Sequence, residues 1–323
     1  MKSANGLLDS SREKPAFWNS PKRYYDFRSY LRNTFGARVA KLTIDGGFTC
    51  PNRDGRRSRG GCIYCDGRGS ALRQQGALPP VTEQLRLAME RYRGSGAEKF
   101  IAYFQTFSGT YAPIERLRSL YDEALDFSPE IVGLSVGTRP DCVPDEVLDL
   151  LASCRSRGRV WLEFGVQSLH EPTLERINRG HSLEELLDAV ERASSRGLDL
   201  VAHVILGLPG ETPGMMRATA RRLASLPFSG LKIHLLLVLE GTPLARIYRR
   251  GEVSLPSLPE YARWVADFLE LVPPTVSIQR LTADGYRDIF VAPEWARNKL
   301  AVLNAIDAEL ARRDSWQGKR SLS

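Results

Sequence analysis

The sequence has no stretch that is long and apolar enough to cross a membrane. No run among its 323 residues approaches the roughly 20 apolar residues that a transmembrane helix requires. The N-terminal stretch MKSANGLLDSSREKPAF also lacks an apolar core of signal-peptide length. We therefore expect a cytoplasmic protein with no membrane partner.

Cysteine and histidine are both scarce, with five and four residues in the chain. In the cytoplasm cysteines stay reduced, so a disulfide framework is not expected. Three of the five cysteines nevertheless fall within one short segment, at Cys50, Cys62 and Cys65. Such clustering in an intracellular protein indicates metal binding or catalysis.

The chain also lacks internal repeats, low-complexity stretches and long linkers, so we expect one domain with terminal additions. Its charge is mildly basic, at +7 from 45 Lys and Arg against 38 Asp and Glu. This excess is compatible with a polyanionic partner and also with an ordinary solvated surface. Charge alone does not identify a ligand.

What the sequence does contain is an alternation of apolar strands and amphipathic helices. Six runs rich in β-branched residues predict strands at 38–44, 99–105, 131–137, 159–166, 198–206 and 230–238. Helical patterns lie between them at 82–93, 113–125, 144–158, 182–197 and 212–226. The alternation predicts βαβ units and a parallel sheet, and both an open six-unit barrel and a doubly wound sheet fit it.

Further segments flank these units. An amphipathic helix at 24–36 precedes the first strand, and an apolar run at 275–281 and a final helix near 295–313 lie beyond the sixth. The chain therefore divides into an N-terminal extension and helix at 1–36, a core barrel at 37–250 with a cysteine loop at 45–78, and a C-terminal extension at 251–323 packed on the barrel.

The cysteine loop follows directly on the first predicted strand and is rich in glycine. The two-residue spacing from Cys62 to Cys65 lets both thiolates of one turn bind the same metal centre. A structural zinc site needs a fourth ligand, yet the nearest histidine is His170. A [4Fe–4S] cluster held by Cys50, Cys62 and Cys65, with its fourth iron open to a non-protein ligand, resolves the count. A zinc knuckle completed by a distant residue is the alternative.

A family resemblance starts from this loop. The segments KLTIDGGFTCPNRDG, RGGCIYC, YFQTFSGTYAP, VGLSVGTRPDCVPDEVLDLL, WLEFGVQSLHEPTLERINRGH, HVILGLPGET, KIHLLLVLEGTPLARIY and SIQRLTAD occur in this order, and the resemblance that they carry extends from about residue 22 to 318. They resemble the radical S-adenosylmethionine (SAM) superfamily, in its YhcC/YtqA-type family, which is related to the radical SAM domain of the Elongator catalytic subunit. The cysteine spacing is C-x11-C-x2-C, where the superfamily signature is C-x3-C-x2-C.

The resemblance implies a fold and two cofactors. The fold is α/β, a partial (β/α)6 TIM-like radical SAM barrel with short N- and C-terminal helical additions. The cofactors are a [4Fe–4S] cluster and SAM, whose amino and carboxylate groups would chelate the open iron. An electron from a reduced flavodoxin- or ferredoxin-type donor would cleave SAM and give a 5′-deoxyadenosyl radical, which abstracts a substrate hydrogen.

By the same resemblance, residues at strand ends bind SAM. Gln105, Thr106 and Ser108 would hold its amino group, and the backbone of Leu206, Gly207 and Leu208 would contact adenine; an ordinary polar strand end and a tight turn are the alternatives. Strand alternation places Glu163 and Gln167 on one face, where the ribose hydroxyls would serve as partners. A salt bridge from Glu163 to Arg139 or Arg159 is the alternative there.

The remaining candidates face the substrate. Arg139 would meet the SAM carboxylate or a substrate phosphate, or form a structural pair with Asp141. Cys142 follows in the same loop, and His234 and Lys232 lie in the sixth predicted strand. We assign these last three residues to catalysis, with buried structural roles as the alternative.

The resemblance also suggests tRNA as the substrate. The Elongator relative acts on carbon 5 of the wobble uridine, and YtqA-type proteins are associated with its 5-aminomethyl-type modification. Acetyl transfer is not expected, since the sequence ends soon after its last helix. Basic segments would frame the cysteine loop at 53–61, 68–75, 311–314 and 317–320. A radical SAM enzyme acting on a small metabolite or porphyrin-like molecule, and a non-catalytic metal-stabilised RNA-binding protein, are the alternatives; the oligomeric state is not predicted.

Overall fold

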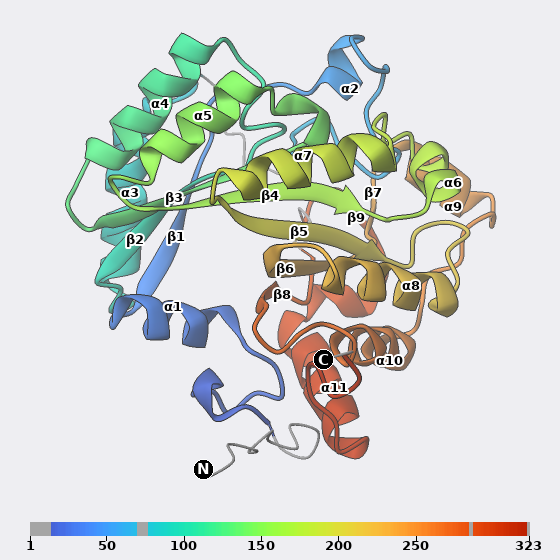
Figure 1. Ribbon diagram of the computed structural model, residues 1–323. Coiled ribbons are helices and arrows are strands. Elements are labelled where there is room, and N and C mark those ends of the chain that lie inside the picture. Colours follow the sequence, from blue (N-terminus) through green and yellow to red (C-terminus); the bar gives the residue numbers. More distant parts are fainter. Residues whose placement is uncertain (1–13, 70–76, 284–286, 322–323) are drawn as a thin grey trace, which may run out of the picture.

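The computed structural model describes residues 14–69, 77–283 and 287–321. Its centre is a parallel sheet whose seven strands lie in the order β1-β2-β3-β4-β5-β6-β8. The sheet curls into a half-barrel with helices on its outer side (Figure 1). The strands are β1 (Val39–Ile44), β2 (Lys99–Phe104), β3 (Ile131–Thr138), β4 (Arg159–Gln167), β5 (Asp199–Leu206), β6 (Phe228–Leu235) and β8 (Ser277–Arg280).

Each crossover between neighbouring strands carries helices, as the alternating pattern predicted. They are α2 (Pro51–Asp54) and α3 (Val81–Arg93), then α4 (Ile114–Asp126), α5 (Asp145–Cys154), α6 (Glu171–Arg176), α7 (Leu183–Ser195) and α8 (Pro213–Ala224). The strands of the parallel sheet are rich in Val, Ile and Leu. Their outer face is covered by these helices and their inner face lines the interior of the half-barrel, which explains their near-continuous apolar sequence. Leu134, Leu162 and Leu200, for example, are fully buried.

Two strands differ from the sequence prediction. The predicted sixth strand at 230–238 leaves the sheet after Leu235, and β7 (Val238–Leu239) pairs antiparallel with β9 (Phe290–Ala292) in a separate small sheet. The apolar run at 275–281 becomes β8, a seventh parallel strand beside β6. The C-terminal segment thus completes the edge of the half-barrel.

Of the remaining α-helices, two lie between β6 and β8 and one lies near each end of the chain. They are α1 (Phe27–Phe35), α9 (Pro243–Arg249), α10 (Leu258–Leu269) and α11 (Lys299–Arg312). The two terminal segments contact each other, since Tyr25 N donates to Gln317 Oε1 at 2.9 Å and Trp18 Nε1 donates to the Pro274 carbonyl at 2.8 Å. No helix in the described part of the chain is long and apolar enough to span a membrane.

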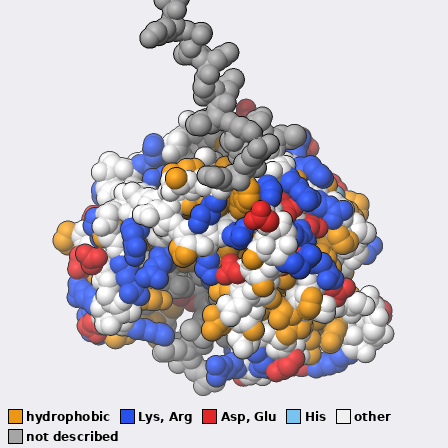
Figure 2. Space-filling model, turned by 90° about the horizontal axis from the view of Figure 1, so that it is seen from below, with side chains coloured by type: hydrophobic (Ala, Val, Ile, Leu, Met, Phe, Trp, Pro, Cys, Tyr) orange, Lys and Arg blue, Asp and Glu red, His pale blue; other side chains and the backbone are white. Residues whose placement is uncertain are grey.

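The C-terminal basic segments do not frame the cysteine loop, so that expectation is wrong. They lie at the end of α11 and just after it, in the lower half of Figure 1, whereas α2 in the loop lies at the top. Arg312 and Arg313 pair with Glu309, and Arg320 Nε lies 3.2 Å from Glu270 Oε2. The face seen from below carries Lys and Arg scattered among acidic and apolar side chains (Figure 2). Of the segment 68–75, residues 70–75 lie outside the described residues.

Candidate active site

The three cysteines of the loop border one cavity where the parallel strands end. Cys50 follows β1 and precedes α2, and Cys62 and Cys65 lie on the return of the loop. Cys62 is buried, and Cys50 and Cys65 are half-buried. We call this space the cysteine cavity. Seven further residues predicted to serve SAM or substrate border it: Gln105, Ser108, Arg139, Glu163, Gln167, Lys232 and His234.

The three thiols do not converge on one point. Within residues 14–69, 77–283 and 287–321, no group of three or more Cys, His, Asp or Glu side chains is placed to hold a single metal ion. A [4Fe–4S] cluster has another requirement, because each cysteine binds a different iron of a larger object. Three thiols around one cavity therefore fit a three-cysteine cluster better than a tetrahedral zinc site.

Nitrogen donors surround the thiols. Arg179 Nη1 and Asn52 Nδ2 lie 3.7 Å and 3.6 Å from Cys62 Sγ, and Arg53 Nη1 lies 4.0 Å from Cys65 Sγ. Burial, and then the neighbouring thiol of Cys62, raise the pKa of Cys65 to about 12. A bound cation would relieve this repulsion and favour the thiolates. The donors around the sulfur atoms thus suit a site that carries negative charge.

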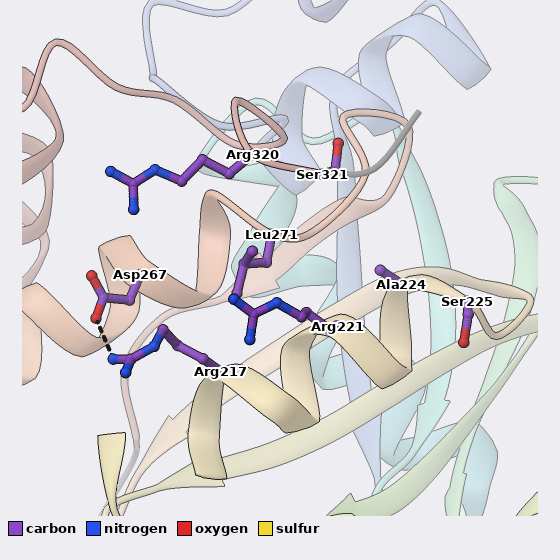
Figure 3. Close-up of a pocket in the computed structure, with 8 residues that line it drawn as sticks. All are labelled: Arg217, Arg221, Ala224, Ser225, Asp267, Leu271, Arg320 and Ser321. Atoms are coloured by element: carbon purple, nitrogen blue, oxygen red, sulfur yellow. Dashed lines mark hydrogen bonds and ion pairs between the residues drawn. The ribbon is translucent and has the colours of Figure 1, made fainter. Parts of the chain in front are cut away.

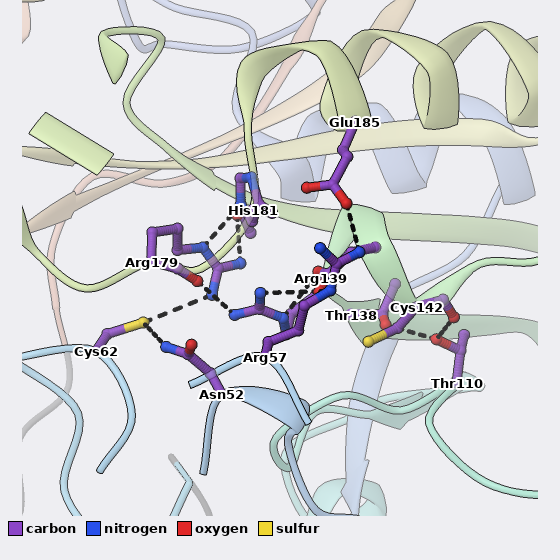
Figure 4. A network of polar contacts seen from close by, with 12 residues as sticks. Asn52, Arg57, Cys62, Thr110, Thr138, Arg139, Cys142, Arg179, His181 and Glu185 are labelled. Carbon is purple, nitrogen blue, oxygen red and sulfur yellow. Dashed lines mark hydrogen bonds and ion pairs between the residues drawn. The ribbon is translucent and has the colours of Figure 1, made fainter. Parts of the chain in front are cut away.

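Arg139 is held by a buried network next to the cavity (Figure 4). It donates from Nε and Nη2 to the two oxygens of Asp141, at 2.8 Å and 3.0 Å, and from Nη1 to the Arg179 carbonyl at 2.7 Å. Arg179 Nε lies 2.9 Å from His181 Nε2, and burial with the charge of Arg179 lowers the pKa of His181 to about 3. The structural pair with Asp141 is therefore present, and contact of Arg139 with SAM stays a prediction.

Glu163 lies at the inner end of the cavity and makes five side-chain contacts. Its Oε1 accepts from Ser135 Oγ at 2.6 Å and pairs with Lys41, and its Oε2 lies 2.9 Å from Tyr103 Oη. Oε2 also lies 2.7 Å from His203 Nε2 and pairs with Lys232. The alternative pairing with Arg139 or Arg159 is wrong, since those arginines pair with Asp141 and Asp199. Both carboxylate oxygens are engaged within the protein, and the predicted contact with the SAM ribose remains untested.

The two lysines beside Glu163 are poorly solvated. Burial lowers the pKa of Lys41 and lowers that of Lys232 to about 7, although Glu163 acts in the opposite direction on both. Burial also disfavours the charged form of Glu163, but the two ammonium groups hold its pKa well below the usual value. Burial lowers the pKa of His203 to about 4. One carboxylate therefore faces two lysines in a confined space.

Gln167 borders the same cavity as Glu163, but the backbone of β4 is irregular between them. Gly165 pairs with His203, whereas Gln167 pairs with Val204, so the register shifts between them. Gln167 itself has a φ of 66°, which is unusual for a residue other than glycine. The two side chains share one cavity, as strand alternation predicted, but a bulge supplies the final turn toward it.

The end of β2 supplies three polar residues. Gln105 and Ser108 border the cysteine cavity, and Thr106 borders an adjoining cavity that shares Gln105, Gln167 and His234 with it. Thr106 is fully buried, and its Oγ1 has no hydrogen-bond partner in the described part of the chain. A buried hydroxyl without a partner is unfavourable unless a ligand completes its bonding. This end of the strand therefore fits the predicted contact with SAM, which stays a prediction.

Four predicted site residues lie elsewhere. None of Leu206, Gly207 and Leu208 borders either cavity, and the Leu206 and Leu208 carbonyls accept from Leu236 N and Glu211 N at 3.4 Å and 3.0 Å. Cys142 borders a separate outer groove and is buried. Burial raises the pKa of its thiol to about 12, so the thiol is protonated at neutral pH. Their predicted roles remain untested.

Four residues in or beside the cavity were not predicted from the sequence. Tyr64, between the two close cysteines, borders both cavities, as does Arg280 at the end of β8. Lys41 and Tyr103 both contact Glu163. A lysine inside an otherwise apolar strand is a signal that could have identified Lys41, since a buried cation needs a partner. Arg280 carried no such signal, because its segment had not been assigned to the sheet.

A second recess lies on the outer surface between α8 and α10. Arg217 pairs there with Asp267 at 3.2 Å, and Arg221 and Arg320 complete its basic lining (Figure 3). None of the three clustered cysteines borders it. This recess is therefore separate from the candidate active site.

Comparison with known families decides what this arrangement is. Residues 52–223 match the Radical SAM superfamily, and residues 228–312 match the Radical_SAM C-terminal domain. The chain belongs to the radical SAM superfamily. It is a radical SAM enzyme, and enzymes of this superfamily use a [4Fe–4S] cluster and SAM. The family predicted from the sequence is thereby confirmed.

Two relatives match this radical SAM enzyme along most of its length. YtqA of Bacillus subtilis is 40% identical over 302 residues, which cover 93% of this chain and 94% of YtqA. YhcC of Escherichia coli is 38% identical over 285 residues, which cover 88% of this chain and 91% of YhcC. Both fall in the YhcC/YtqA-type family that the sequence resembles.

The half-barrel is also found in a solved structure, that of Elp3 from the archaeon Methanocaldococcus infernus with an N-terminal deletion. The TM-score is 0.64 at 19% identity, and the match covers 86% of this chain and 64% of the Elp3 chain. At this identity the likeness shows the fold alone. The radical SAM enzyme spans less than two thirds of that Elp3 chain.

Proposed function

We propose that Cys50, Cys62 and Cys65 hold a [4Fe–4S] cluster and that SAM binds beside it in the cysteine cavity. The three thiols border the same space as the polar ends of β2, β3 and β4, which supports this assignment. The cofactors supply the radical chemistry when bound. The chain holds and orients them, shields the reacting atoms from water, and receives an electron from a flavodoxin- or ferredoxin-type donor.

We propose that the substrate is tRNA and that the enzyme modifies the 5-aminomethyl-type side chain of the wobble uridine. The similarity to YtqA and YhcC along nearly the whole chain carries this proposal, because the sequence resemblance links that family to wobble-uridine modification. The Elp3 fold is in agreement with it. Arg56 and Arg59 are exposed on the same loop as Cys50, where an RNA backbone could approach the cavity.

Profiling of tRNA nucleosides in a deletion strain tests this function. We expect one 5-substituted wobble uridine to disappear and its precursor to accumulate, and the wild-type gene to restore it. A gene carrying Cys62→Ala should not restore it, because the substitution removes a cluster ligand. An unchanged nucleoside profile, with SAM cleavage intact in the purified protein, would move the substrate to a small metabolite.

The exposed arginines of the loop should govern the salt dependence of tRNA binding. Each lost phosphate contact on single-stranded RNA reduces the slope of log affinity against log salt by about 0.7. We expect the double variant Arg56→Glu/Arg59→Glu to bind tRNA more weakly and with a flatter slope. Arg57 is left unchanged, because it already pairs with Glu185 and lies 3.4 Å from Asp141. The measurement is tRNA affinity across a salt series.

A matched control separates a specific surface from net charge. Arg28→Glu/Arg32→Glu changes the net charge by the same amount on α1, which lies away from the cysteine loop in Figure 1. It should leave the slope close to that of the wild type. Equal weakening by both double variants would show that RNA binding at this loop is nonspecific.

A further inference from the structure

The inner end of the cysteine cavity carries an excess of buried positive charge. Tyr103, Glu163, His203, Lys232 and His234 border the cavity there, and Lys41 pairs with Glu163 beside it. We call these six side chains the barrel floor. The side chains of Glu163, Lys232 and Lys41 are 0%, 6% and 15% exposed, so water screens their charges poorly. Two ammonium groups share this one carboxylate.

The lysines are fixed rather than free to reach solvent. Lys232 Nζ and Lys41 Nζ each lie 4.4 Å from the centre of the Tyr103 ring, and each pairs with a different oxygen of Glu163. Lys232 Nζ also lies 2.9 Å from Tyr103 Oη. A lysine whose only role was to neutralise Glu163 would not need a second lysine beside it. Lys41 Nζ also lies 3.1 Å from Ser135 Oγ and 3.3 Å from Gln279 Oε1, whereas Lys232 borders the cavity, so the surplus positive charge reaches the cavity through Lys232.

His234 adds a second, independent observation. Its ring stacks on His203 with 5.3 Å between centroids, and it borders both the cysteine cavity and the adjoining one. Its buried Nε2 has no hydrogen-bond partner among the described residues. A buried ring nitrogen without a hydrogen-bond partner is unfavourable, and so is buried positive charge without an anion. A bound anion would satisfy both, so the two features together indicate a ligand site.

We propose that the barrel floor binds an anionic group of the substrate, a carboxylate or a phosphate, with Lys41 and Lys232 supplying the charge and His234 Nε2 a further hydrogen bond. This inference rests on the proposed function and deepens it, because it names the chemistry of the substrate group that enters the cavity. Glu163 then acts as a positioning residue that holds the lysines in place.

The anion should bind more weakly as the pH rises. An anion favours the charged form of Lys232, which the free protein loses as the pH rises above about 7. The charged and titratable groups that face Lys232 come from five other strands and its own: Lys41, Tyr103, Glu163, His203, Arg280 and His234. Glu163 is the one anion among these groups, so it is the carboxylate that favours the protonated form of Lys232.

The test uses RNA binding to the cluster-loaded protein without turnover. The probes are anticodon stem-loops whose wobble uridine carries a 5-aminomethyl-type side chain that ends in a carboxylate, or the methyl ester of that carboxylate, two groups of similar shape that differ in charge. We expect the wild type to prefer the carboxylate by about tenfold or more, as for a charge-assisted contact. The preference for the carboxylate should decline between pH 6.5 and 8.5, because this range spans the pKa of Lys232, which is about 7.

Lys232→Met should reduce that preference to within about threefold, because it removes the surplus charge. The variant should keep its fold, since Lys41 and Glu163 then remain as a balanced pair, and its thermal unfolding temperature should not fall. Lys99→Met is the control, because Lys99 lies at the start of β2 and donates to the Phe35 carbonyl at 3.0 Å. It should behave like the wild type.

The other outcomes separate the possible sources of the anion. If the two stem-loops bind equally, and inorganic phosphate but not acetate raises the unfolding temperature of the wild type and not of Lys232→Met, the anion is a phosphate. If Lys232→Met instead weakens SAM binding tenfold, the floor serves SAM and the inference is overturned. If no stem-loop binds, the tRNA function fails, and the acetate and phosphate shifts decide the floor alone. No difference between wild type and Lys232→Met in any assay also overturns it.

Discussion

Replacement of Cys50, Cys62 or Cys65 by alanine is expected to reduce the rate of reductive SAM cleavage by more than about a hundredfold. Loss of a residue that only hydrogen-bonds to a metal ligand costs about ten- to a hundredfold, and loss of the ligand itself should cost more. Each thiol borders the same cavity, and no other cysteine does. The measurement is 5′-deoxyadenosine formed under reductant by anaerobically reconstituted protein. Iron and sulfide content should fall in parallel.

Cys154→Ala is the matched control for the three cysteine variants. Cys154 is fully buried at the end of α5, within the core between helix and sheet. Its replacement should lower stability slightly and leave SAM cleavage unchanged. Stoichiometric zinc without iron in protein prepared in the absence of oxygen would contradict the cluster assignment and favour the zinc alternative.

Glu163→Ala is expected to destabilise the fold by about 3–5 kcal/mol, because it leaves buried charge without its partner. Both lysines of the barrel floor would lose the one carboxylate with which they pair in the described part of the chain, and Tyr103, Ser135 and His203 would lose an acceptor. The measurement is the free energy of unfolding from urea titration of the cluster-free protein. Gln167→Ala, on the same strand, should change that free energy by less than about 1 kcal/mol.

A double variant separates charge from packing. Adding Lys232→Met to Glu163→Ala removes one of the stranded ammonium groups, so the double variant should be more stable than Glu163→Ala alone. The two substitutions should therefore be strongly non-additive, as expected for directly interacting residues. Additive losses would mean that Glu163 stabilises the fold through its volume rather than its charge.

The repeating units of the fold could be read from the sequence because they depend on local patterns. The apolar runs and helix starts place β1 to β5 and the helices α3, α4, α5, α7 and α8 within a few residues of the predicted bounds, whereas the short helix α6 was not predicted. The prediction for 144–158 extends beyond α5, which ends at Cys154. The hydrophobic period predicts that a helix exists better than it predicts where the helix ends, because the last turn depends on local backbone hydrogen bonds.

The seventh strand was not predictable in the same way. Ser277–Arg280 is short, and its neighbour β6 ends more than forty residues earlier in the chain. Its place depends on pairing with Gly230, Leu231 and Lys232, a contact between distant segments. Local propensity carries little information about such pairing. The position of Arg280 beside the cavity therefore followed only from the structure.

The sequence by itself determined the family, the parallel βαβ organisation and the three cysteines, because each resides in a contiguous segment whose spacing carries the chemistry. Only the tertiary structure decided which side chains meet inside the half-barrel. Lys41 and Glu163 are 122 residues apart, and Glu163 and Lys232 are 69 apart. Their pairing depends on strand order and on burial that removes water from all three, so the charge imbalance of the barrel floor exists only once the sheet has closed around it.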